Sequence, residues 1–133
     1  MNLSKTTSYS LNVLSYMAKN KEEICSANYL HKKLHIPHQY LRQLLTKLSK
    51  SGFIHSTRGR NGGFVFSKEI SGIYVADIIE AVEGLESFNK CILGFTDCPL
   101  DAQCSMHEFW EGTRDRIIKE LKTTSLADLL LKK

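Results

Sequence analysis

Four leucines in the middle of the chain are spaced as they would be on one face of a helix. The spacing i, i+3, i+4 and i+7 is that of an amphipathic helix, and it is formed by Leu41, Leu44, Leu45 and Leu48. Pro37 suits the first turn of this helix, where a missing N–H costs nothing, and Ser51-Gly52 ends it. The pattern therefore predicts a helix over about 38–50 with buried leucines and an exposed opposite face.

Two short runs rich in aromatic and β-branched residues follow this helix, at 53–57 and 64–67. The stretch that separates them is Arg58-Gly59-Arg60-Asn61-Gly62-Gly63. Asparagine and glycine tolerate the positive φ that a hairpin turn requires. The sequence therefore predicts a β-hairpin directly after the leucine-rich helix.

Further helices are predicted on both sides of this unit. Apolar periodicity indicates a helix over 6–20, and Ser26 is a suitable N-cap for a second, short helix. After the hairpin, similar patterns indicate helices over 75–82 and from about 104 to 122. A capping box, Ser125-x-x-Asp128, introduces a last helical turn.

Three short helices followed by a two-stranded hairpin have the order of a winged helix-turn-helix. The predicted class is thus mainly α with a small β-hairpin wing, namely a winged helix-turn-helix plus a long C-terminal helix. A chain of 133 residues suits one modest domain. Within that single compact domain we expect a winged helix-turn-helix region over 1–70, and a region over 71–133 with the cysteine-rich segment and the last helices.

Charge is distributed unevenly between these two regions. Residues 1–70 hold 11 Lys and Arg against 3 Asp and Glu, whereas residues 71–133 hold 7 against 11. A basic half joined to an acidic half is typical of a protein that contacts phosphates with one end. Solvated surface lysines would give the same count, so the charge supports nucleic-acid binding only together with the predicted fold.

The start of the chain, residues 1–5, lacks the apolar run of a signal peptide, and no segment approaches the roughly 20 apolar residues that span a bilayer. We therefore expect a cytoplasmic protein without a membrane partner. In that compartment clustered cysteines bind metal more often than they form disulfides. Cys25 lies apart from the others and is predicted to be a small buried side chain.

Three cysteines and a histidine fall within seventeen residues of the acidic half, in the pattern Cys91-x6-Cys98-x5-Cys104-x2-His107. Thiolates stabilise iron–sulfur clusters, and a histidine that replaces one thiolate raises the reduction potential. Cys104 and His107 are three residues apart at a predicted helix start, so both side chains can face one site. The four residues are therefore the candidate ligands of a metal or cluster.

Two other roles for these residues compete with the cluster. A structural zinc site is chemically possible with three cysteines and a histidine, but zinc ligands usually have tighter spacing. A catalytic Cys–His pair lacks an evident third partner in the sequence, and we predict no enzymatic activity. His107 alone would also fit an ordinary exposed helical position.

The helix over 38–50 supplies the candidate DNA-reading residues. With its leucines buried, the exposed face presents Gln39, Gln43, Thr46 and Lys50, flanked by Arg42. Gln and Arg make bidentate hydrogen bonds to base edges, whereas Lys mostly meets phosphates. Arg58 and Arg60 in the hairpin turn are expected to reach the minor groove or its phosphates.

The chain resembles the Rrf2-type family of bacterial transcription regulators along essentially its whole length, and in particular the branch that binds clusters. The resemblance is carried by Tyr40-Leu41-Arg42-Gln43-Leu44, by Thr57-Arg58-Gly59-Arg60-Asn61-Gly62-Gly63-Phe64 and by Val75-Ala76-Asp77-Ile78-Ile79-Glu80-Ala81-Val82-Glu83-Gly84. It implies a homodimer, joined largely by the long C-terminal helix, on a two-fold related double-stranded DNA operator. By the same resemblance Tyr40, Arg42 and Gln43 lie in the major groove.

The resemblance also implies an iron–sulfur cluster, because cluster-bearing members carry three cysteines at nearly this spacing. The gap between Cys91 and Cys98 is one residue longer than in the branch that adds a histidine at the position of His107. Another branch places an aspartate ligand where this chain has Ser8. A 2Fe–2S cluster is slightly favoured over a 4Fe–4S cluster because of His107.

The sequence thus leads to one hypothesis and two alternatives. The hypothesis is a DNA-binding transcriptional regulator whose operator affinity depends on a cluster in a loop expected to adjoin the wing and the dimer helix. The first alternative is a cluster-free regulator of the same fold that responds to thiol oxidation or to a partner protein. The second is a zinc-stabilised protein–protein adaptor.

Overall fold

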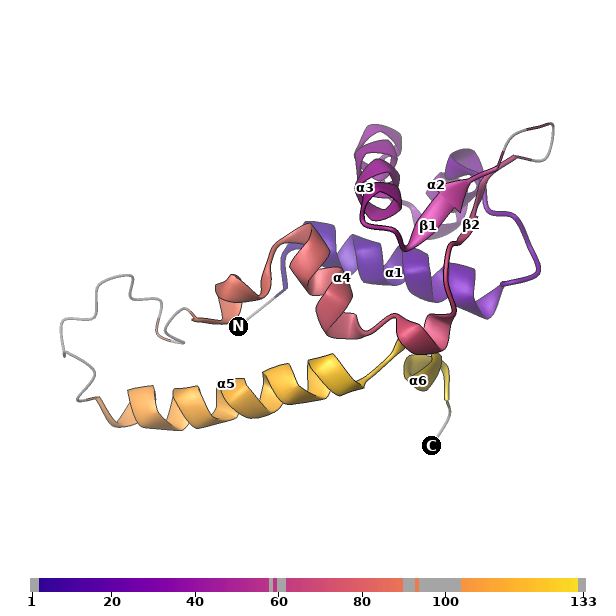
Figure 1. The fold of residues 1–133 in the computed structure, drawn as a ribbon. Coiled ribbons are helices and arrows are strands. Elements are labelled where there is room, and N and C mark those ends of the chain that lie inside the picture. The colour runs from indigo at the N-terminus through magenta and orange to yellow at the C-terminus, as the bar shows by residue number, and fades with distance from the viewer. Residues whose placement is uncertain (1–2, 58, 60–61, 90–92, 94–103, 132–133) are drawn as a thin grey trace.

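The computed structural model describes residues 3–57, 59, 62–89, 93 and 104–131, and its elements follow the predicted order (Figure 1). The helices and strands are α1 (Lys5–Lys19), α2 (Ala27–Leu34), α3 (His38–Lys50), β1 (Ile54–Ser56), β2 (Phe64–Phe66), α4 (Val75–Val82), α5 (Ser105–Thr123) and α6 (Leu126–Leu130). Two short 3-10 helices, η1 (Ile70–Gly72) and η2 (Leu85–Asn89), were not predicted. The winged helix-turn-helix with a long C-terminal helix is confirmed.

The winged helix-turn-helix, formed by α1, α2, α3 and the hairpin, is called the reader. Local sequence explains several of the boundaries of its helices. The Ser26 side chain accepts a hydrogen bond from the Tyr29 amide at 3.0 Å, so it caps α2 as predicted. His35 takes a left-handed conformation with φ of 56° and turns the chain into α3. Gly52, with φ of +86°, closes α3.

The wing is a two-stranded antiparallel hairpin in which Ile54 pairs with Phe66, and Ser56 with Phe64. Both strands are shorter than predicted. At the start of β1, the Phe53 amide bonds the Leu48 carbonyl at 3.2 Å and so belongs to the end of α3, although the Phe53 carbonyl accepts from the Ser67 amide at 2.9 Å. β2 also pairs with the segment before α2. The Phe64 amide donates to the Cys25 carbonyl oxygen at 2.8 Å.

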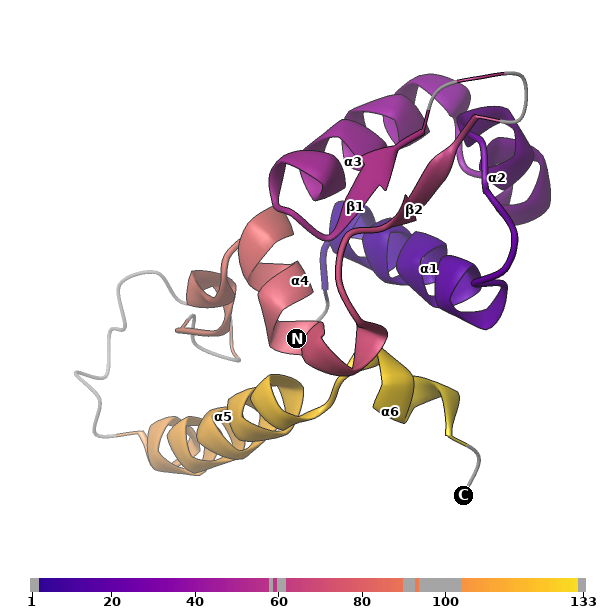
Figure 2. The ribbon, with the colours of Figure 1, turned by 45° about the vertical axis from the view of Figure 1, so that its right-hand side comes forward.

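One hydrophobic core holds the reader together, and it crosses the boundary between the two charge regions. The leucines of α3 are at most 2% exposed, as their spacing predicted. They belong to one cluster with Leu14 and Leu30, and also with Ile73, Ile78 and Leu126 from the acidic half. Figure 2 shows how this occurs, since α4 and α6 both lie against α1.

A smaller apolar cluster holds the long helix α5 on α4. Val75 and Ile79 of α4 pack with Phe88, and Ile117 and Leu121 of α5 cover them. Two backbone hydrogen bonds fix the far end of α5. The Val75 amide donates to the Thr124 carbonyl at 2.9 Å, and the Leu126 amide to the Ile73 carbonyl at 2.8 Å.

Within the described ranges, every helix is too short or too polar to cross a lipid bilayer.

Candidate nucleic-acid interface and metal-ligand segment

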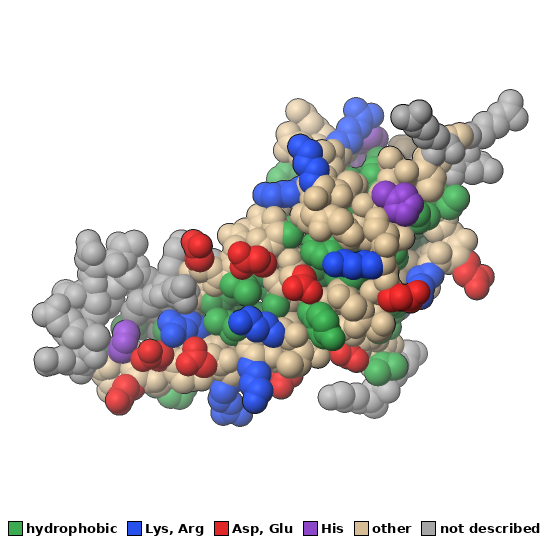
Figure 3. Space-filling view, viewed as in Figure 1, with side chains coloured by type: hydrophobic (Ala, Val, Ile, Leu, Met, Phe, Trp, Pro, Cys, Tyr) green, Lys and Arg blue, Asp and Glu red, His purple; other side chains and the backbone are tan. Residues whose placement is uncertain are grey.

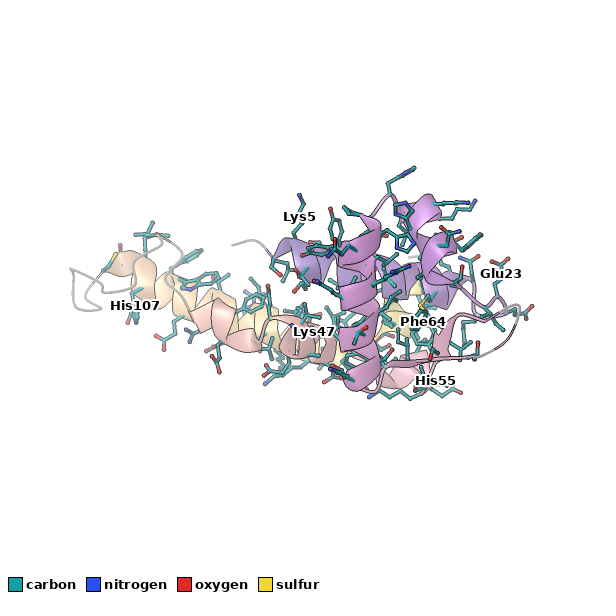
Figure 4. All side chains as sticks on the ribbon, turned by 90° about the horizontal axis from the view of Figure 1, so that it is seen from above. Lys5, Glu23, Lys47, His55, Phe64 and His107 are labelled. Atoms are coloured by element: carbon teal, nitrogen blue, oxygen red, sulfur yellow. The ribbon has the colours of Figure 1, made fainter. Side chains whose placement is uncertain are left out.

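The outer face of α3 is the candidate surface for reading bases. Gln39, Arg42, Gln43 and Thr46 are all exposed on it, as expected when the leucines point inward. Figure 4, in which the molecule is seen from above, shows α3 in front of the rest of the reader. The first half of the helix therefore presents amide and guanidinium groups with no other described element covering them.

Two of the predicted DNA-contacting side chains already have partners inside the protein. The Thr46 hydroxyl donates to the Arg42 carbonyl at 3.0 Å, within α3 itself. The Tyr40 hydroxyl is hydrogen-bonded to that of Thr6 at the start of α1, and its ring lies edge-on to Tyr9, with centroids 5.4 Å apart. Tyr40 is half-buried, so its hydroxyl faces α1.

Fewer of the predicted DNA-contacting residues can be described in the wing than in α3. Arg58 and Arg60, the predicted minor-groove residues, lie outside the described residues. At the base of the hairpin, His55 is exposed and its Nδ1 is 2.8 Å from the Ser67 hydroxyl. The structure therefore places the frame of the wing beside α3 (Figure 2) and leaves the two arginines as predictions.

The electrostatic character of α3 suits a polyanion. The helix carries Arg42, Lys47 and Lys50 and no acidic residue. On the face shown in Figure 3, most acidic side chains lie over α4 and α5, with Lys and Arg side chains among them. The uniformly basic character thus belongs to α3 itself rather than to the whole of its half of the surface.

Lys47 is a further residue of this surface and was not among the predicted DNA-contacting residues. Its ammonium donates to the Val82 carbonyl, 3.0 Å away at the end of α4. The one signal in the sequence was its position four residues after Gln43, which puts both side chains on one side of α3. The partner, 35 positions further along the chain, could not be read from that pattern.

The described half of the predicted ligand set lies together at the start of α5. Cys104 is the N-cap residue of α5, and its free thiol is partly exposed. The His107 amide bonds the Cys104 carbonyl at 3.0 Å, and the exposed imidazole has Glu111 3.7 Å from its Nε2. Cys91 and Cys98 lie outside the described residues.

The donor chemistry of this pair fits a cluster ligand. A free thiol at a helix start and an imidazole one turn later are both open to solvent, so no buried contact must break for them to bind iron. Among the described residues, no three metal-binding side chains gather. The pair at the start of α5 is therefore the described part of the predicted site.

The predicted position of this segment relative to the wing is wrong for its described end. Figure 4 shows His107 at one end of the protomer and the wing residues His55 and Phe64 at the other. The reason is the direction of α5, a helix of 19 residues that is fixed to the start of α4 at Thr124 and extends away from that point. In one protomer, any influence of this segment on DNA must pass through other elements.

The fourth cysteine, Cys25, differs in kind from Cys104. It is 1% exposed beneath the wing, and the carboxylate of Glu23 lies on the same short segment. Burial, with a smaller effect of Glu23, raises the pKa of the Cys25 thiol above its ordinary value. Cys25 is thus the structural cysteine that the sequence predicted.

The chain is similar to known regulators of transcription. The model of the Rrf2 family, described as an iron-dependent transcriptional regulator, matches residues 3–132. A protein of Aquifex aeolicus, provisionally named an HTH-type transcriptional regulator, is 32% identical over 132 residues, which cover 98% of this chain and 92% of that protein.

Solved structures show the same likeness. CymR, the global cysteine regulator of B. subtilis, is 28% identical, with a TM-score of 0.79 over 97% of this chain and 95% of that one. T. potens IscR is 26% identical, with a TM-score of 0.75 over 98% of this chain and 86% of that one. The similarity extends over nearly the whole chain and agrees with the fold described above.

Proposed function

Since this chain belongs to the Rrf2 family of transcriptional regulators, we propose that an iron–sulfur cluster bound by Cys91, Cys98, Cys104 and His107 controls its affinity for DNA. The family and the compared proteins are regulators of transcription rather than enzymes. The protein itself is therefore a winged helix-turn-helix regulator, and the proposal concerns what sets its activity. We expect it to act in the cytoplasm.

The observation that carries the proposal is the placement of Cys104 and His107 one turn apart at the solvent-exposed start of α5. The family description as iron-dependent gives independent support. When bound, an iron–sulfur cluster supplies a redox-active group whose loss or oxidation changes the charge and geometry of its ligands. His107 slightly favours a 2Fe–2S over a 4Fe–4S cluster.

The residues of α3 perform the DNA-binding part of this function. Gln39, Arg42 and Gln43 would contact base edges in the major groove, with Thr46 beside them. Arg58 and Arg60 would reach the minor groove or its phosphates. We propose a two-fold related double-stranded operator, because two recognition helices in a symmetric dimer must meet two equivalent half-sites.

The homodimer in this proposal is supported by the face of α5 that the protomer leaves open. Trp110 is the one buried side chain of this 19-residue helix, while Phe109 is 63% and Met106 37% exposed. A hollow of about 350 Å³ on the same helix is lined by Thr113, Arg116, Ile117, Glu120 and Leu121. A second copy of α5 would remove this apolar surface from water.

A cluster-free regulator that responds to thiol oxidation is the second candidate. It is favoured by the likeness to CymR, the global cysteine regulator of B. subtilis, and by a solved oxidised form of CymR from Staphylococcus aureus at 25% identity. In that case the reactive thiol would belong to a cysteine of the acidic half, because Cys25 is buried away from solvent. The adaptor alternative has no support from the family.

The test is the metal content of protein purified without oxygen, together with its visible absorbance. We expect iron and acid-labile sulfide in equal amounts, and a coloured protein that loses its colour when Cys104 is changed to Ala. Cys25→Ala is the matched control, because it removes a cysteine that lies outside the ligand segment. That variant should keep the colour.

Two results would refute the cluster. Colourless protein without iron, whose DNA affinity changes on mild oxidation, would establish the thiol-responsive regulator. Stoichiometric zinc without sulfide would identify a structural metal site instead. A duplex retardation assay on the same samples tests the DNA-binding part separately, so the two parts of the proposal can fail independently.

A further inference from the structure

Lys47 joins the recognition helix to the end of α4. Its side chain leaves the flank of α3 and its Nζ donates a 3.0 Å hydrogen bond to the carbonyl oxygen of Val82. The ammonium carries three hydrogens, and the Val82 carbonyl takes one of them. The side chain is on an exposed position of α3, so the remaining hydrogens can reach an acceptor from outside the protein.

A hollow lies at this flank, between the start of α1 and α3. Its volume is about 210 Å³, and it is lined by Thr6, Tyr40, Gln43, Leu44 and Lys47. The buried Leu44 is its apolar wall, and the other four residues bring two hydroxyls, an amide and an ammonium. Figure 4 shows Lys5 at the beginning of α1, on the side of α3 that Lys47 also occupies.

The position of the hollow matches the place of a backbone phosphate. A recognition helix that lies in the major groove has base edges along its outer face and phosphates along its flanks. Gln43 belongs to the outer face, and Lys47 follows it by one turn on the α1 side. A lysine at that flank meets a phosphate rather than a base.

We infer that Lys47 binds a DNA backbone phosphate in this hollow while it stays bonded to the Val82 carbonyl, and that it thereby links DNA binding to the end of α4. The inference rests on the proposed placement of α3 in the major groove. It adds a phosphate subsite that the base-reading residues do not include. It also connects the chain segment that precedes Cys91 to DNA, through the hydrogen bond between Val82 and Lys47.

The second half of the inference follows from the contacts next to Val82. The Glu83 carboxylate accepts a 3.1 Å hydrogen bond from the Ser4 amide at the start of α1. The Leu85 amide, where η2 begins, donates to the Glu80 carboxylate at 2.9 Å. The segment 82–89 is therefore held to both α1 and α3, so a phosphate that draws the Lys47 ammonium outward also acts on this segment. By thermodynamic linkage, if phosphate binding shifts the conformational equilibrium of this segment by some factor, a change in the conformation of the segment alters the affinity for phosphate by that same factor.

The affinity test uses the full chain and a mixed-sequence duplex of about 30 base pairs, long enough for two half-sites. Phosphate contacts persist on non-specific DNA, so no operator is needed. Because a dimer carries two copies of Lys47, Lys47→Met should weaken binding about tenfold for each protomer, or about a hundredfold for the dimer. It should lower the log–log salt slope by about 0.9 for each lost contact, or about 1.8 for the dimer. Lys47→Arg should keep both values near those of the unchanged chain.

Lys119→Met is the matched control, because it removes the same charge from an exposed position of α5. It should leave the salt slope unchanged. A Lys47→Met slope equal to that of the unchanged chain would overturn the phosphate subsite. If the unchanged chain itself fails to bind duplex at low salt, the proposed DNA-binding function fails instead, which is a distinguishable result.

Hydrogen–deuterium exchange tests the link to α4. Saturating duplex should alter exchange of the amides at 83–89 in the unchanged chain and in Lys47→Arg, but not in Lys47→Met at a duplex concentration that saturates it. An equal response in Lys47→Met would overturn the link while leaving the subsite in place. Thermal unfolding of each variant shows whether it is folded. If Lys47→Met is not, Lys47→Gln takes its place, because it removes the charge but keeps a donor for the Val82 carbonyl.

Discussion

The amide of Phe64 donates a 2.8 Å hydrogen bond to the carbonyl oxygen of Cys25, which fastens the second strand of the wing to the segment before α2. The close approach depends on the residue next to Phe64. A Cβ on Gly63 would lie 2.7 Å from both the carbonyl carbon and the carbonyl oxygen of Cys25. Glycine is thus required here because two backbones touch, rather than for a positive φ.

Gly63→Ala should therefore displace the wing. Relieving the clash requires backbone movement, and we expect a loss of about 1–3 kcal/mol in the free energy of unfolding together with weaker binding to duplex DNA. Denaturant unfolding and a retardation assay measure the two effects. Gly72→Ala is the control, because a Cβ at Gly72 would have no atom within 4 Å; equal effects of the two substitutions would contradict the argument.

Thr6 and Tyr40 should behave as a pair that positions α3 on α1. Their hydroxyls are hydrogen-bonded across 34 positions of the chain, so Tyr40→Phe and Thr6→Val should each cost about 1 kcal/mol of stability, and the double variant less than the sum. A double-mutant cycle from denaturant unfolding measures the coupling. If Tyr40→Phe changes base preference and Thr6→Val does not, the Tyr40 hydroxyl reads DNA directly.

Cys25 and Cys104 should differ in their reaction with iodoacetamide in the reduced, metal-free protein. The thiolate is the reactive form, and burial raises the pKa of Cys25. Its thiolate is therefore scarce near pH 7 and increases only as pH rises through that elevated pKa. Peptide mass spectrometry should show Cys104 modified first at neutral pH, with Cys25 following only at alkaline pH or after unfolding. Equal rates at pH 7 would show that Cys25 is accessible.

Phe109→Ser should weaken self-association without unfolding the protomer. Phe109 is 63% exposed in the single chain, so its loss should change the free energy of unfolding of the isolated protomer by less than about 0.5 kcal/mol. Sedimentation over a range of concentrations should show dissociation at higher concentrations than for the unchanged chain. Ile24→Ser, which alters another exposed apolar residue far from α5 in the sequence, should leave the association unchanged.

The helices of this fold could be predicted because each rests on a local signal. The α3 leucines repeat with helical periodicity, and the caps Ser26 and Ser125 accept the hydrogen bonds that their residue types suggest. The 3-10 helices η1 and η2 have no such repeat. The predicted start of β1 was one residue too early because Phe53, apolar like a strand residue, uses its amide to close α3.

The candidate site could be predicted only where it depends on one helix face. Gln39, Arg42 and Gln43 are exposed as their spacing indicated. The pairs Lys47–Val82 and Thr6–Tyr40 join positions 35 and 34 residues apart, and only packing of α3 against α4 and α1 creates them. The predicted closeness of the ligand segment to the wing was wrong for its described end at Cys104 and His107, because the direction of α5 is set by contacts at its far end.

The shared core has a consequence for anyone who wishes to study DNA recognition on a shortened chain. Cutting after residue 70 would remove Ile73, Ile78, Val82 and Leu126 from the cluster that surrounds the α3 leucines. Four buried aliphatic side chains contribute on the order of 6–12 kcal/mol together, which is as much as the whole net stability of a typical small domain. The basic half by itself is thus expected to be unfolded, and the acidic half is a structural component of the DNA reader.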